Sequence, residues 1–195
     1  MLYVKFTVED ESKYQDFQKV YDHMLMTRQS YFEFEEEEDD DEDEFDWMHS
    51  SQEEINQYLE ENKPEVKRYK KLFPAYADAY LKSYLGFDAS RAGVFGFDLM
   101  GIFNYLEFDF EVDLDNLERF GDRKGLVEFS TGNYPFGGME RFFITLKAFG
   151  LIPVECFNGF EVYTFDWVSE YEYKTVDLPE KTKRYKEERV VDRTL

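Results

Sequence analysis

The chain has 195 residues, a formal net charge of −21, 43% hydrophobic residues and 19% aromatic residues. This apolar content excludes a disordered chain, and the negative charge argues against direct binding to nucleic acid or to an anionic membrane surface. The length suits one domain with a single hydrophobic core.

The amino terminus and the cysteine content together predict a cytoplasmic location. The opening sequence MLYVKFTVEDE has no apolar core followed by a cleavage site, so we expect no signal peptide. Cys156 is the only cysteine, so no internal disulfide can form, which is typical of a reducing compartment. No apolar run approaches the length of a membrane span, and we expect no membrane contact.

The first part of the chain predicts a strand followed by helices. Residues 2–8 alternate in polarity and predict a strand, and an apolar stripe at helical spacing predicts a helix from about residue 14 to 29. An acidic insert, residues 33–47, comes next. It contains twelve acids and no base, so it holds more than half of the excess negative charge.

Capping and breaking residues predict the limits of the next helices. Ser51 and Glu54 match a capping box that begins a short helix, and Pro64 suits the first turn of another. A helical apolar face continues past Pro74, which we expect to kink or restart that helix. Gly86 is expected to end it.

The second part of the chain reads mainly as strands. Residues 93–99 predict a short apolar strand, 104–114 a longer strand, and 125–130 a third. The stretch 115–122 predicts a short helix or turn. In residues 104–114 apolar residues alternate with acids, which places four carboxylates on one face. Those acids are Glu107, Asp109, Glu111 and Asp113.

The last elements complete an α+β pattern. A loop precedes a helix at about residues 138–149, which Gly150 ends, and Asn158-Gly159 between alternating stretches is a strong hairpin signal. A regular succession of strand, helix and strand is missing, so the fold class is α+β with a mostly antiparallel or mixed sheet packed by several helices. We expect one domain over residues 1–168 and a charged, partly ordered C-terminal tail over 169–195.

The acidic run within the insert has three interpretations. It can be a solvated segment that only aids solubility, a ligand for cations, or a source of electrostatic field for a partner. An EF-hand loop alternates acids with small residues around a central glycine, and residues 35–44 have neither feature. We therefore expect no metal site. Phe34, Phe45 and Trp47 flank the run and are candidate anchors for a partner.

The acidic strand face is a second candidate for partner binding. Alternate residues of a strand lie about 6.6 Å apart, so the four carboxylates of residues 107–113 would form a straight row of anions. Such a row on a rigid sheet resembles a strand of phosphates and suits the basic groove of a nuclease or DNA-binding protein. The plain alternative is a solvated polar face, which any half-buried strand shows.

The loop over residues 130–142 is a candidate site for a small anionic ligand. Two glycines precede a helix whose N-terminal amides can hold an anion, while aromatic rings and an arginine lie close by in the sequence. The pattern is neither a Walker loop nor a dinucleotide fingerprint, so a tight turn is the alternative. The residues concerned are Tyr134, Phe136, Gly137, Gly138 and Arg141.

Motifs for catalysis are missing from the sequence. His23 and His49 are the only histidines, and neither belongs to a recognisable metal or catalytic motif. Cys156 reads as a small buried residue. We therefore expect no catalytic residues and no cofactor.

Three hypotheses of function remain. The first is a non-catalytic acidic protein that holds or neutralises a basic protein, such as a nuclease, toxin or DNA-binding protein, in the manner of an inhibitor, immunity protein or nucleic-acid mimic. The second is a small-ligand protein or enzyme that uses the 130–142 loop. The third is a structural or adaptor domain with a solubilising acidic run.

Overall fold

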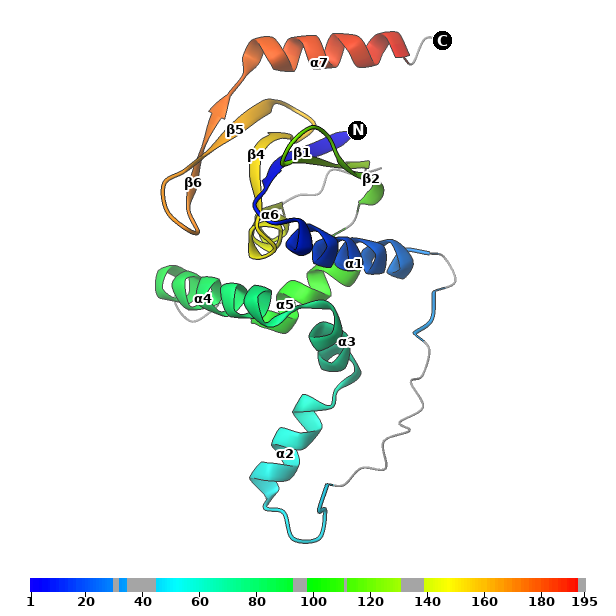
Figure 1. The fold of residues 1–195 in the computed structure, drawn as a ribbon, viewed down its shortest axis with the longest axis vertical. Helices are drawn as coiled ribbons and strands as arrows, with labels where there is room; N and C mark the ends of the chain where they lie inside the picture. Colours follow the sequence, from blue (N-terminus) through cyan, green and yellow to red (C-terminus); the bar gives the residue numbers. More distant parts are fainter. Residues whose placement is uncertain (30–31, 35–44, 93–97, 111, 131–138, 193–195) are drawn as a thin grey trace.

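The computed structural model describes residues 1–29, 32–34, 45–92, 98–110, 112–130 and 139–192. Within these parts, six strands form one antiparallel sheet with helices packed on both faces, so the predicted α+β class is confirmed (Figure 1). The strands are β1 (Leu2–Val8), β2 (Asp113–Arg119), β3 (Lys124–Ser130), β4 (Leu151–Phe157), β5 (Val162–Trp167) and β6 (Tyr173–Asp177). The helices are α1 (Glu11–Thr27), α2 (Gln52–Glu61), α3 (Pro64–Leu72), α4 (Ala75–Ala92), α5 (Leu99–Asn104), the π-helical turn η2 (Tyr105–Asp109), α6 (Met139–Ala148) and α7 (Pro179–Asp192).

The first strand of the chain lies inside the sheet, whose order is β2-β3-β1-β4-β5-β6. β1 pairs antiparallel with β3 and β4, so that Val4 lies opposite Val127 on one side and Cys156 on the other. Val4 and Phe6 are fully buried, whereas Lys5 between them is partly exposed on the opposite face. The alternation in the sequence of β1 therefore separates the two faces of the sheet, as predicted.

Aromatic side chains fill the space between the sheet and the helices. α1 and α6 lie against one face of the sheet, α4 packs against α6, and α7 lies over the other face (Figure 1). The ring of Phe17 on α1 lies 6.4 Å from that of Phe142 and 5.6 Å from that of Phe149. Burying each such ring stabilises the fold by about 1.5–3 kcal/mol, so the many phenylalanines of the sequence account for a large share of the core.

The predicted helix limits are confirmed except for one. Ser51 and Glu54 form a complete capping box at α2, and Pro64 is the first residue of α3. Pro74 separates α3 from α4, because a proline nitrogen cannot donate a helical hydrogen bond. The prediction for Gly86 was wrong, since α4 continues through this exposed glycine. A helical glycine loses only about 1 kcal/mol relative to alanine, and packing of the neighbouring turns outweighs that cost.

The stretch 104–114 is not a strand, and this is the largest correction to the prediction. Asn104 ends α5, residues 105–109 form η2, and strand pairing begins only at Asp113. The following residues, predicted as a helix or turn, instead continue β2 to Arg119, paired with β3. Of the predicted strand 93–99, residues 93–97 lie outside the described residues, while Asp98 caps α5 and Leu99 begins it.

The hairpin between β4 and β5 is confirmed, with a longer turn than predicted. Phe157 pairs with Val162, so residues 158–161 all belong to the turn. The Asn158 side-chain oxygen accepts hydrogen bonds of 2.9 Å from the backbone N–H groups of Phe160 and Glu161. Gly159 has a φ of 97°, and Gly150, which ends α6 as predicted, has a φ of 64°. Both conformations suit glycine because it has no Cβ.

The C-terminal segment contains two elements that the prediction of a partly ordered tail missed. β6 extends the sheet by pairing with β5, and α7 then crosses the outer face of the sheet. Tyr185 of α7 packs its ring 5.2 Å from that of Tyr3 and 4.7 Å from that of Phe157. These contacts join α7 to β1 and β4.

Candidate functional site

Glu107, predicted to lie on an exposed acidic face, is one of the most buried residues of the protein. Only 1% of it is exposed, and its carboxylate accepts two hydrogen bonds from Arg68, of 2.9 and 3.0 Å. The Nε2 atom of His23 lies 2.7 Å from Oε1 of Glu107. Burial disfavours the charged form of Glu107, but the hydrogen bonds from His23 and Arg68 outweigh this effect and hold its pKa below the ordinary value.

A second arginine fixes the backbone of the π-helical turn around Glu107. The guanidinium group of Arg28 donates hydrogen bonds to four backbone carbonyls, which belong to Met24, Leu106, Phe110 and Val112. These bonds replace the partners that carbonyl groups lose where a helix ends. The segment is therefore held by α1 and α3 from outside, which is why its alternating sequence does not form a strand.

The predicted row of four acids is consequently not formed. Glu107 points inward, Asp109 is exposed in η2, and Asp113 is exposed at the start of β2. Glu111 lies outside the described residues. A row of phosphate-like charges on one strand face therefore has no structural basis.

Phe34, a predicted anchor, covers the buried Glu107 cluster. Its ring lies 3.7 Å from the guanidinium carbon of Arg68, a cation–π contact, and 6.4 Å from the ring of His23. Phe32 and the exposed Phe108 pack edge-on against it, at 4.7 and 6.2 Å. The residues just before the acidic run are thus attached to the body of the protein.

Phe45 and Trp47, the other predicted anchors, belong to a separate unit that we call the α2 arm, residues 45–61. Their rings lie 4.9 Å apart, and both contact Tyr58 on α2, at 4.1 and 5.3 Å. α2 itself has no buried residue. In Figure 1 it projects from α3 to the end of the molecule farthest from α7.

The α2 arm exposes an apolar surface within acidic surroundings. Ile55, Tyr58 and Leu59 lie on one face of α2, since they are three and four residues apart. Leu59 is 50% exposed, Trp47 47% and Met48 91%. Between residues 45 and 62 the sequence has five acids and neither lysine nor arginine. The arm therefore resembles the surface of an interface, with rings at its centre and charges around them.

The loop at 130–142 lies mostly outside the described residues, and this includes Tyr134, Phe136, Gly137 and Gly138. Arg141 lies in the first turn of α6, with its guanidinium carbon 5.2 Å from the ring centre of Tyr105. Tyr105 is only 3% exposed, and its hydroxyl has no hydrogen-bond partner within the described part of the chain. A buried hydroxyl without a partner costs free energy, so this one is a candidate donor to a ligand.

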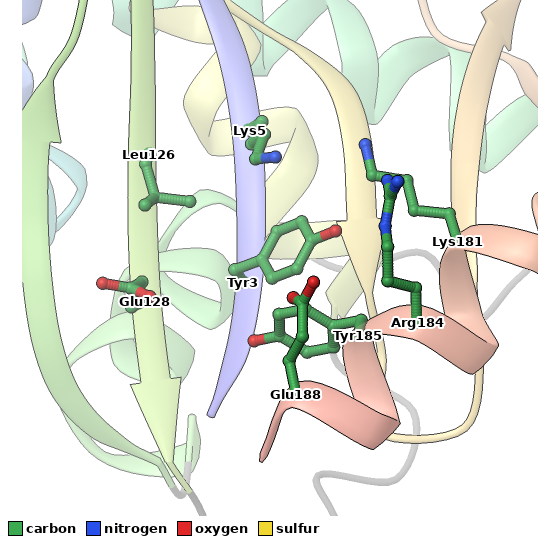
Figure 2. A pocket seen from close by; sticks show the side chains of 8 residues that line it. All are labelled: Tyr3, Lys5, Leu126, Glu128, Lys181, Arg184, Tyr185 and Glu188. Atoms are coloured by element: carbon green, nitrogen blue, oxygen red, sulfur yellow. The ribbon is translucent and has the colours of Figure 1, made fainter. Parts of the chain in front are cut away.

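A polar pocket lies between α7 and the outer face of the sheet, where the sequence predicted no site (Figure 2). It has a volume of about 240 Å³. Its lining comes from β1, β3 and α7 and consists of Tyr3, Lys5, Leu126, Glu128, Lys181, Arg184, Tyr185 and Glu188. We call it the α7 pocket.

The buried Glu155 of β4 lies beside this pocket and receives three donors. The Tyr3 hydroxyl donates to it at 2.8 Å, Lys5 Nζ lies 3.1 Å from Oε1, and Lys181 donates to Oε2. Burial disfavours the charge of Glu155, but the bonds from Lys181, Tyr3 and Lys5 outweigh this and hold its pKa below the ordinary value. Burial, together with the hydrogen bond to Glu155, raises the pKa of Tyr3.

The candidates for catalysis occupy structural positions. His49 lies 2.8 Å from the carboxylate of Asp46 in the same exposed turn. Burial raises the pKa of the Cys156 thiol to about 12, so the reactive thiolate is disfavoured. Lys147 is buried with its ammonium group 3.9 Å from the ring centre of Trp167, and it donates to the carbonyl of Glu170. Within the described residues, no three or more His, Cys, Asp or Glu residues gather where they could hold a metal ion.

No protein-family model matches the chain, and no curated protein and no solved structure shows a significant match. Among the helices in the described ranges, none has the length and apolar character that crossing a membrane requires.

Sequence reasoning missed Tyr3, Lys5, Lys181, Arg184 and the buried role of Glu107. The contact of Lys181 with Glu155 joins residues 26 positions apart, and that of His23 with Glu107 joins residues 84 apart. One local signal was available, because an isolated Lys5 within an apolar strand indicates a polar contact on the second face of the sheet.

Proposed function

We propose that the protein is a non-catalytic acidic binding protein that holds a basic protein partner through the α2 arm. The observation that carries this proposal is that α2 is a complete, capped helix without a buried residue, although it presents an apolar face. A helix of ten residues is marginal when isolated, and packing normally stabilises it. A partner that covers the arm would supply that packing.

The charge around the arm specifies the chemistry of the partner. The arm follows directly on the acidic run 35–44, and neither lysine nor arginine lies between residues 32 and 62. A second copy of this chain, with a formal charge of −21, would be repelled by this region. A basic protein would be attracted, and its association would be fast at low salt and slower at high salt.

The aromatic cluster of Phe45, Trp47 and Tyr58 provides the contact itself. Trp and Tyr are the residue types that most often carry binding free energy at interfaces. The rings already contact one another, so they lose little conformational freedom when a partner binds. The partner class, a nuclease, toxin or DNA-binding protein, follows from the need for a strongly basic surface. The proposal keeps the expected cytoplasmic location, which rests on the single cysteine.

Affinity purification with matched variants tests this proposal. The tagged protein, its Trp47→Ala variant and a Phe160→Ala control would each be exposed to native lysate at low and high salt. Phe160 is 60% exposed but lies in the β4–β5 turn, away from the arm. We expect a basic protein that is retained at low salt by the wild type and the control and is lost from Trp47→Ala. Identical partners for all three proteins, or partners that are acidic, would contradict the proposal.

A second candidate function is supported by the unpartnered hydroxyl of Tyr105. Together with Arg141 and the N-terminus of α6, it offers donors to a small anion at the 130–142 loop. A thermal-shift screen with anionic metabolites tests this function. A compound that stabilises the wild type but neither Arg141→Ala nor Tyr105→Phe would support it, and a screen without such a compound would count against it.

A further inference from the structure

The α7 pocket is independent of the α2 arm and lies at the other end of the molecule (Figure 1). Its floor is the sheet surface of β1 and β3, and one wall is α7. Most of its lining side chains are ionisable, and Figure 2 shows that they come from β1, β3 and α7, with Tyr3, Tyr185 and Glu188 close together between α7 and the sheet. The distribution of charge in this space decides what can bind there.

The carboxylate of Glu155 is satisfied without help from outside. It has three donors, Tyr3, Lys5 and Lys181, and it is 8% exposed. Each lysine ammonium group has three N–H donors, and this contact uses one from each. Both lysine side chains remain 34% exposed. The remaining N–H donors of Lys5 and Lys181 are therefore available to the pocket.

Arg184 adds a third cation to the lining of the pocket. It lies three residues after Lys181, which places both on one face of α7, and Figure 2 shows both side chains extending in the same direction. It makes no hydrogen bond or ion pair with any residue in the described ranges. Three cations thus gather at this pocket, beside the buried carboxylate of Glu155 and two more exposed glutamates of the lining, in a chain whose overall charge is strongly negative.

The remaining lining makes the pocket asymmetric. Glu128, whose carboxylate accepts a 3.2 Å hydrogen bond from Asn116, and Glu188 on the next turn of α7 are its acidic groups. The rings of Tyr3 and Tyr185 meet edge to face, and Leu126 adds an apolar patch. An anion would therefore be held by the cations, while a ring or short hydrocarbon attached to it would lie on the tyrosines.

From this arrangement we propose that the α7 pocket binds a small molecule through an oxyanion group, phosphate or carboxylate, with Arg184 as its main ligand. Arginine presents a planar fork of N–H donors that matches both groups in a bidentate manner. Lys181 and Lys5 add charge and single hydrogen bonds. Tyr3 positions the two lysines indirectly, since it shares Glu155 with them.

Titration by two-dimensional NMR with small anions at constant ionic strength tests the proposal. The probes are inorganic phosphate, phenyl phosphate and benzoate, with chloride as the reference salt. We expect saturable shifts at the amides of residues 3–5, 126–128 and 181–188. Phenyl phosphate should bind more tightly than phosphate because its ring lies on the tyrosines. Phenyl phosphate and benzoate carry the same ring, so the comparison of their affinities shows whether the pocket prefers a phosphate or a carboxylate group.

Two substitutions in the lining are expected to change the affinity for phosphate in opposite directions, which tests whether the anion binds in this pocket. Arg184→Gln should weaken phosphate binding about tenfold, the size of one charge-assisted hydrogen bond. Glu188→Gln should strengthen it, because it removes a negative charge from the lining. Both residues are exposed, so the fold should tolerate either change. Lys183→Gln is the matched control, since Lys183 is an exposed cation of α7 that does not line the pocket.

Each alternative result would overturn the proposal. Linear, non-saturable shifts spread over the surface would show screening by the added salt and no site. Equal losses in Arg184→Gln and Lys183→Gln would show a general effect of positive charge. Saturable shifts confined to Arg141 and its neighbours would assign the anion to the 130–142 loop.

Discussion

α2 and α7 are both charged helices at opposite ends of the molecule, yet only α7 packs on the sheet (Figure 1). Lys181 of α7 contacts the buried Glu155, and Tyr185 packs on Tyr3 and Phe157. α2 also has an apolar face, but there the ring of Tyr58 contacts other rings of the α2 arm, Leu59 stays 50% exposed, and no residue of α2 is buried. A charged helix docks where the sheet offers both a ring contact and a buried opposite charge. This difference supports the proposal that α2 is a surface for another molecule.

The largest effect on stability is expected from Glu107. Its carboxylate binds Arg68 of α3, the helix from which the α2 arm projects (Figure 1). Glu107→Ala leaves Arg68 and His23 without their acceptor in a buried position, so we expect the free energy of unfolding to fall by about 3 kcal/mol or more. Urea denaturation at pH 7 measures this change. Asp109→Ala, an exposed acid two residues further on, is the control and should change it by less than about 0.5 kcal/mol. Equal effects would show that Glu107 is not the anchor.

A smaller loss in the free energy of unfolding is expected from Glu155, which attaches α7 to the sheet through Lys181. Glu155→Ala removes the acceptor of Lys5, Lys181 and Tyr3, but the lysines are one-third exposed, so water partly replaces it. We expect about 2 kcal/mol of destabilisation and faster hydrogen exchange of α7 amides. Glu180→Ala, an exposed acid at the start of α7, should have neither effect. Unchanged exchange in Glu155→Ala would mean that the rings alone hold the helix.

The two buried glutamates also predict how stability responds to pH. Both have pKa values below the ordinary 4.5 in the folded state, so their contribution is present above about pH 4.5 and is lost as the pH falls through the folded values. The free energy of unfolding should therefore fall more steeply between pH 5 and about pH 3 in the wild type than in Glu155→Gln. A constant difference between the two proteins over this range would contradict the assignment.

The smallest effect on stability is expected in the arm. Leu59→Ser should leave the free energy of unfolding within about 0.5 kcal/mol of the wild type, since Leu59 is half exposed and α2 has no buried residue.

Deletion of residues 35–44 should also leave the fold intact but reduce the salt dependence of partner binding. Calorimetry and binding at two salt concentrations measure these changes. A partner set and salt dependence unchanged by the deletion would favour a solubilising role for the run.

The parts of the fold that depend on neighbouring residues could be predicted from the sequence, and the parts that depend on distant contacts could not. Local signals were sufficient for β1, for the capping box of Ser51 and for the break at Pro74, because each depends on residues within one or two turns. The alternation of residues 104–114 misled the prediction, because the burial of Glu107 depends on Arg68 and His23, which are distant in sequence. The docking of α7 likewise depends on Glu155, and no local pattern in a charged helix reveals such a partner.

The candidate site was predicted only in part. Phe34, Phe45 and Trp47 were selected because they flank the acidic run, and the structure places them in two separate ring clusters at its two ends. That Phe34 stacks on the partly buried Arg68, whereas Trp47 contacts other rings of the α2 arm, follows from tertiary packing. The exposed cluster is therefore the more direct site to test.

The fluorescence of Trp47 tests most directly whether a basic protein covers the α2 arm. The chain has two tryptophans, so Trp167→Phe leaves Trp47 as the only one. This variant would be titrated with the basic protein recovered by affinity purification, under conditions where the partner's own emission is subtracted. If the partner covers the arm, Trp47 emission should shift to shorter wavelength, and the shift should saturate with binding and be lost at high salt. Saturated binding with unchanged Trp47 emission would contradict this proposal, because the partner would then lie elsewhere on the protein.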